Sequence, residues 1–150
     1  MISLIKPSWR KPKMRVLSNL RELDESLKDW ERYQQCSLED LKKDRDKRNM
    51  ILHAMLVSIQ AAIDISSHLI SQNDLKRPAT YRETFEFLGR AEIISEELAA
   101  ELSDLAGFRN VLVHVYWDLD LDEIYSILQN DLKTLRSFRD VIKELLGKSY

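Results

Sequence analysis

The sequence predicts an all-α fold, an antiparallel bundle of four to five helices. Hydrophobic residues recur at steps of three and four along most of the chain, which is the period of a helix with one buried face. Only three glycines and three prolines occur among 150 residues, and no segment alternates as a strand would. Hydrophobic residues make up 44% of the chain and charged residues 32%, so one domain can bury a core without disulfides.

Residues 1–13 predict a basic tail ahead of a single domain over residues 14–150. The tail carries four cationic side chains around two prolines and lacks the apolar block of a secretion signal. The single cysteine, Cys36, cannot form an internal disulfide, and no apolar run approaches the roughly 18 residues of a membrane span. We therefore expect a cytoplasmic protein. The net charge of −2 argues against a broad nucleic-acid-coating surface, but it permits a local site.

The first half of the chain predicts two long helices. The first covers about residues 16–34, and its apolar stripe includes Leu20, Leu23, Leu27 and Trp30. The second begins after an N-cap at Ser37 and continues to about residue 71 without glycine or proline. A helix of that length would span about 50 Å, so we expect its first portion to project or kink. A polar line crosses its apolar half, at Gln60, Asp64, Ser67 and Ser71.

The second half predicts a loop over residues 73–79 and two further helical regions. Thr80 and Glu83 form a capping-box pattern, and the apolar periodicity that follows weakens at Gly89 and then resumes to residue 112. Asp120 and Glu123 repeat the capping-box pattern ahead of a last helix, which we expect to end near Gly147.

The candidate site lies within residues 109–116, where Arg109, His114 and Tyr116 interrupt an apolar segment. A fixed cation, a group that titrates near neutral pH and a phenol are together suited to handling phosphate. On a regular helix Arg109 and His114 lie about 140° apart, whereas Tyr116 lies only about 20° from Arg109. Three arrangements would bring the first two together: the arginine side chain swings round, a turn at Gly107 shifts the helix, or two copies of the chain meet.

From the residue types alone, a histidine in an apolar segment is more often a hydrogen-bonded core residue than a catalyst. His53 and His68 have no partners at metal-ligand spacing, and the charged run over residues 42–48 is typical of a solvated helix face.

The spacing Arg109, four residues, His114, one residue, Tyr116 matches the R-x4-H-x-Y motif of HEPN domains. The chain resembles the HepT-like toxins in particular, and the similarity continues over residues 59–65, 81–88 and 109–120. In all it covers about residues 14–146.

The resemblance implies a dimeric, metal-independent endoribonuclease toxin with no cofactor, paired with a minimal nucleotidyltransferase antitoxin that transfers AMP to tyrosine. By match, Arg109 and His114 are the catalytic residues, and Tyr116 is the modified one. Asn110, Tyr116 and Asp64 are supporting residues beside them. An alternative is a non-catalytic HEPN module that binds nucleotide or RNA and is the transferase's partner and substrate. A helical scaffold without a nucleic-acid role is a third possibility.

Overall fold

The computed structural model describes residues 12–72 and 77–149, which form seven helices and no strand. In chain order these helices are α1 (Pro12–Tyr33), α2 (Leu38–Lys43), α3 (Arg45–Gln72), α4 (Tyr81–Arg90), α5 (Glu96–His114), α6 (Leu121–Asn130) and α7 (Leu132–Ser149). The predicted all-α bundle is confirmed, although three of its predicted helices are each divided in two. Residues 1–11 of the predicted basic tail lie outside the described residues, and α1 begins at Pro12.

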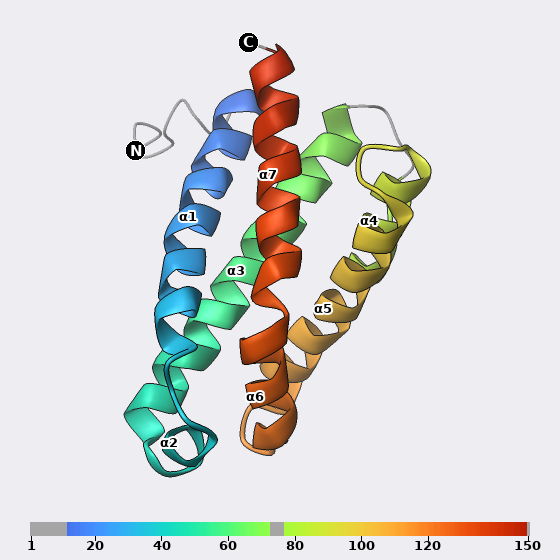
Figure 1. Ribbon diagram of the computed structural model, residues 1–150. Coiled ribbons are helices and arrows are strands. Elements are labelled where there is room, and N and C mark those ends of the chain that lie inside the picture. The colour runs from blue at the N-terminus through green and yellow to red at the C-terminus, as the bar shows by residue number, and fades with distance from the viewer. Residues whose placement is uncertain (1–11, 73–76, 150) are drawn as a thin grey trace, which may run out of the picture.

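α3 is the central helix of the bundle, because it packs against α1, α4, α5 and α7. Figure 1 shows α1 and α7 running beside one another along α3, while α4 and α5 form a hairpin on its other side. Length and apolarity would allow α3 to cross a membrane, yet 61% of its apolar window is buried within the bundle. Its apolar character is therefore that of a core helix.

The break between α2 and α3 confirms the expected kink and occurs at Asp44. This residue leaves the helical conformation at φ −95° and ψ 100°. Its backbone N–H ends α2 by donating to the Asp40 carbonyl, and its carboxylate accepts from the Lys47 N–H in the first turn of α3. The guanidinium of Arg48 donates to the Leu41 and Lys42 carbonyls at the end of α2. One aspartate and one arginine thus fix the break between the two helices.

The third predicted helical region weakens where the sequence indicates, just after Gly89, and the weakening is a complete break: α4 ends at Arg90 and α5 begins only at Glu96. A Schellman turn ends α4: the Ile93 N–H donates to the Leu88 carbonyl and the Glu92 N–H to the Gly89 carbonyl. Glu92 takes the left-handed conformation, φ 61°, that glycine usually occupies there. Gly89 has a different role, because a Cβ at this position would lie 2.8 Å from the Cβ of Ala99. It lets α4 and α5 approach closely.

The last predicted helix is also divided, at Asp131, and α7 continues through Gly147 to Ser149. The break leaves the Leu128 carbonyl among the last four of α6, which have no partner within their helix. The Trp30 indole N–H donates to this oxygen at 2.8 Å, and the Gln34 amide donates at 3.0 Å. α1 therefore stabilises the break between α6 and α7.

Candidate functional site

The predicted site residues lie along the C-terminal half of α5 and in the turn that follows it. The N-terminus of α5 is fixed by Ser95, whose hydroxyl accepts from the Leu98 N–H. Gly107 lies inside the helix and no turn occurs there, so a shifted helix is not what brings Arg109 and His114 together. Their offset of about 140° therefore stands within this subunit.

Neutral groups hold the guanidinium of Arg109. Its Nε donates to Gln60 Oε1 at 3.0 Å, and one of its terminal nitrogens donates to Asn110 Oδ1 at 3.3 Å. Its carbon lies 5.0 Å from the centre of the Tyr81 ring, within the range of a cation–π contact. Among the described residues these are the contacts of the Arg109 guanidinium, and none of them is with a carboxylate. Its full positive charge is therefore available to an incoming anion.

Asp64 orients Arg109 indirectly, through Gln60. The amide nitrogen of Gln60 donates to Asp64 Oδ1 at 3.0 Å, so the Gln60 carbonyl oxygen is turned toward Arg109. Asp64 makes a structural hydrogen bond to Gln60 and no direct contact with Arg109. Gln60 stands between them and keeps the negative charge of Asp64 away from the guanidinium, because a directly bound carboxylate would compete with phosphate for the same donors.

His114 is the last residue of α5, and its side chain is exposed. No hydrogen bond or ion pair joins it to another of the described residues, including Asn110 on the same face. The imidazole is thus accessible to a bound ligand.

Tyr116 lies beyond the helix, so the prediction that it shares a helical face with Arg109 is wrong. α5 ends because Val115 departs from helical geometry, at φ −130° and ψ 38°. A turn then follows in which the Asp118 N–H donates to the Val115 carbonyl. The Tyr116 hydroxyl donates to Asn49 Oδ1 at 2.5 Å and lines a pocket of about 350 Å³ with Arg45 and Arg48. The phenol therefore faces the start of α3.

Sequence reasoning did not identify the residues that hold Arg109 and Tyr116, namely Gln60, Tyr81 and Asn49. The sequence offers one indication of Gln60, because Gln60 and Asp64 are polar residues four positions apart on an otherwise apolar helix. Tyr81 begins a segment that resembles the family, yet nothing in it indicated a contact with Arg109, and Asn49 carried no signal at all, because it is an ordinary exposed residue on its helix. In the described part of the chain no three His, Cys, Asp or Glu side chains are grouped closely enough to hold a metal ion.

The bundle, with an arginine, a histidine and a tyrosine at the end of one helix, is of the HEPN class. The family model described as "Ribonuclease HepT-like" matches residues 23–142, and the chain belongs to this family.

Two curated relatives have sequences similar to this one. The mRNA nuclease HepT of Shewanella oneidensis is 36% identical over 84 residues, which cover 56% of this chain and 63% of the relative. The tRNA nuclease HepT of Aphanizomenon flos-aquae is 31% identical over 94 residues, covering 63% and 64%. Each alignment therefore spans slightly less than two thirds of the relative.

Solved structures are similar over a longer stretch. A tri-AMPylated Shewanella oneidensis HEPN toxin in complex with its MNT antitoxin has a TM-score of 0.79 at 25% identity, and the match covers 87% of this chain and 97% of that one. A cytosolic protein of unknown function from Bacillus subtilis, at 17% identity and a TM-score of 0.69, shares the fold.

Proposed function

We propose that the protein is the toxin of a toxin–antitoxin pair, an endoribonuclease that needs no metal and acts in the cytoplasm. A nucleotidyltransferase antitoxin silences it by transferring AMP to Tyr116. The observation that carries the proposal is the Arg109 guanidinium, which neutral groups hold in place while its charge stays unpaired. The nuclease names of the relatives and the AMPylated toxin complex among the similar structures support it.

The residues at the end of α5 supply what RNA cleavage requires. RNA carries its own nucleophile, the 2′-hydroxyl, and His114 accepts its proton as the oxygen attacks the adjacent phosphorus. Arg109 binds the phosphate and stabilises the charge that grows on its oxygens. The bond to the 5′-oxygen breaks, and that oxygen takes a proton from a second imidazole, the His114 of the partner subunit. The products are a 2′,3′-cyclic phosphate and a 5′-hydroxyl.

Cleavage of RNA by the purified protein in excess EDTA tests this proposal most directly. We expect single-stranded RNA to be cut at an undiminished rate, because the 2′-hydroxyl, His114 and Arg109 provide the nucleophile, the base and the positive charge. The fragments should carry cyclic phosphate at their 3′ ends, which mass spectrometry detects. Binding of RNA without cleavage would instead identify a non-catalytic HEPN module, and absence of both would leave a helical scaffold.

We also propose that two copies of the chain form one cleft at the end of α5. Large hydrophobic side chains are exposed there, at Val111, Val113, Val115, Tyr116 and Trp117. Trp117 is 84% exposed, and a cluster of this kind usually marks an interaction surface. A two-fold axis beside α5 would cover the cluster and bring the exposed His114 of one subunit toward the Arg109 of the other.

Substitution of Val111 by glutamate is expected to convert a dimer into a monomer and to abolish RNA cleavage. Val111 is 47% exposed and has no part in holding Arg109, so the bundle itself should remain folded. Light scattering at micromolar concentration measures the change in mass. Leu17, 40% exposed on α1, provides the matched control, since Leu17→Glu should remain dimeric. A wild-type monomer with full activity would disprove the shared cleft.

Replacing Gln60 with leucine is expected to reduce cleavage while leaving the fold intact. A hydrogen bond to a charged group contributes about 1.5–3 kcal/mol, which corresponds to roughly a tenfold to hundredfold loss of kcat/KM if it positions Arg109 in the transition state. Gln60→Glu should be impaired as well, because a carboxylate would pair with Arg109 and compete with the phosphate. Steady-state kinetics with a short RNA separates kcat from KM. Unchanged kinetics in Gln60→Leu would show that Arg109 needs no support from α3.

A further inference from the structure

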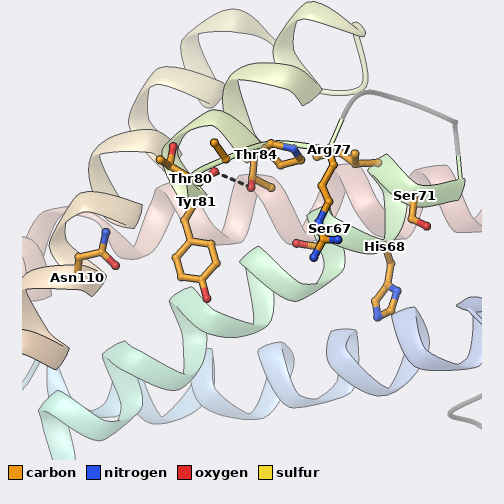
Figure 2. Close-up of a pocket in the computed structure, with 11 residues that line it drawn as sticks. Ser67, His68, Ser71, Arg77, Thr80, Tyr81, Thr84 and Asn110 are labelled. Carbon is orange, nitrogen blue, oxygen red and sulfur yellow. Dashed lines mark hydrogen bonds between the residues drawn. The ribbon is translucent and has the colours of Figure 1, made fainter.

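A second feature of the molecule lies beside Arg109 and is lined in part by the neighbouring Asn110. A pocket of about 960 Å³ opens between the last turns of α3 and the start of α4. Figure 2 shows the side chains of Tyr81, the first residue of α4, and Arg77, in the segment before it, both pointing toward α3, where Ser67, His68 and Ser71 line the opposite wall. Pockets that bind small organic ligands have volumes of about 300–1,000 Å³, so the space suits a nucleotide.

The lining of the pocket offers a contact for each part of a nucleotide. The Arg77 guanidinium is exposed, and among the described residues no hydrogen bond or ion pair holds it, so it can bind a phosphate. The Tyr81 ring, 36% exposed, presents an aromatic surface for a base. The hydroxyls of Ser67 and Ser71 can donate to or accept from a ribose. Burial lowers the pKa of His68, whose neutral ring then offers one donor and one acceptor.

The pocket is continuous with the surroundings of Arg109. Tyr81 lines the pocket and also lies under the Arg109 guanidinium, while Asn110 lines it and accepts a hydrogen bond from the same group. A phosphate bound to Arg109 would therefore lie at the mouth of the pocket. The nucleotide attached to that phosphate is the part of an RNA chain that reaches inside.

We propose that this pocket binds the ribonucleotide next to the scissile phosphate, with its base against Tyr81 and its outer phosphate on Arg77. The inference rests on the proposed function in that it takes RNA as the ligand and Arg109 as the site of the scissile phosphate. It adds a second anchor on the substrate, which fixes the phosphodiester relative to Arg109 and His114. The pocket thus determines which phosphate along the strand is cut.

Binding of uncleavable RNA measures the contribution of the pocket. Fluorescent oligoadenylates of two to five residues with methylated 2′-oxygens lack the nucleophile, so they report binding whether or not the protein cleaves RNA. We expect the dissociation constant, measured by anisotropy, to fall by about tenfold at the length that first reaches the pocket, since stacking of one base has an effect of that size. At other lengths, the addition of one residue to the oligomer should change the dissociation constant by a smaller factor.

Two variants should remove this tenfold step in affinity and leave the dissociation constant of the shortest oligomer unchanged. Arg77→Ala deletes the cation, and Ser67→Phe fills the pocket from an exposed position on α3. Arg90→Ala and Ser137→Phe make the same changes at exposed positions outside the pocket and should retain the step. Arg109→Ala, in contrast, should weaken binding at every length.

The possible outcomes separate this inference from the proposed function. A smooth dependence of affinity on length, or an undiminished step in Arg77→Ala and Ser67→Phe, would overturn the pocket's role even if the protein cleaves RNA. Saturable binding of free AMP that the oligomers do not displace would overturn it too. A step that both variants lose, in a protein that does not cleave RNA, would disprove the ribonuclease and support the pocket.

Discussion

Replacing His114 with alanine is expected to lower the rate of RNA cleavage by a factor of about 10²–10⁴, the usual contribution of a positioned general acid or base. The fold should be unaffected, because the side chain is exposed and no described contact holds it. His53, another exposed histidine, lies on α3 outside the site, so His53→Ala provides the matched control and should retain full activity. Gel-based cleavage of a labelled RNA measures all three proteins.

Arg109→Ala should show a similar loss, about 10²–10³, because it removes the charge that stabilises the phosphate in the transition state. Arg109→Lys should recover only part of this, since an ammonium keeps the charge but lacks the planar fork of a guanidinium. Circular dichroism must accompany these measurements, because Arg109 also contacts Gln60 and Tyr81. Normal cleavage by both alanine variants would refute the assigned site, and unfolding of both would show that the two residues are structural.

Adenylylation at Tyr116 is expected to abolish cleavage. The hydroxyl donates to Asn49 at the start of α3, and the tyrosine is nearly half exposed, so a transferase can reach it. Each added AMP carries negative charge and bulk into the pocket beside Arg45 and Arg48, and it repels RNA phosphates that approach the end of α5. Incubation with the cognate transferase, ATP and magnesium, followed by mass spectrometry, should locate the adenylyl group on the peptide that contains Tyr116.

Tyr116→Phe distinguishes this control mechanism from simple steric block. The variant should not be labelled, and the transferase with ATP should no longer reduce its cleavage of RNA. Tyr125→Phe, altered at a half-buried tyrosine on α6, is the matched control and should be modified like the wild type. Labelling confined to Tyr125 or Tyr81 would contradict the assignment of Tyr116, yet it would leave the ribonuclease proposal intact.

The helix starts were predictable from the sequence because capping is local. Ser37, Thr80 and Asp120 each accept a backbone N–H from the first turn of the helix that follows. In two respects the patterns were only approximate. The Glu83 carboxylate accepts from the Ala79 N–H rather than from that of Thr80, and Ser95 was not recognised as the cap of α5.

The helix breaks were harder to predict because their causes are not local. Glu92 adopts a conformation that its side chain does not favour, and the break at Asp131 depends on Trp30 and Gln34, more than 90 residues away in sequence. The candidate site also has a part that is local in sequence and a part that is not. The motif predicts Arg109 and His114 as site residues, whereas the partners of Arg109 on α3 and α4 cannot be found from periodicity along α5.

The bond from Trp30 to the Leu128 carbonyl has a consequence for synthesis on the ribosome. The chain emerges from its N-terminus, so α1 is made long before the residue that its indole must contact. The segment with Arg109 and His114 is also extruded before α6 and α7, which complete the core around α1 and α3. We therefore expect a nascent chain to hold its arginine and histidine on an unfinished scaffold. The proposed nuclease activity would then arise only after translation of the message is complete, when the chain leaves the ribosome and meets a second copy.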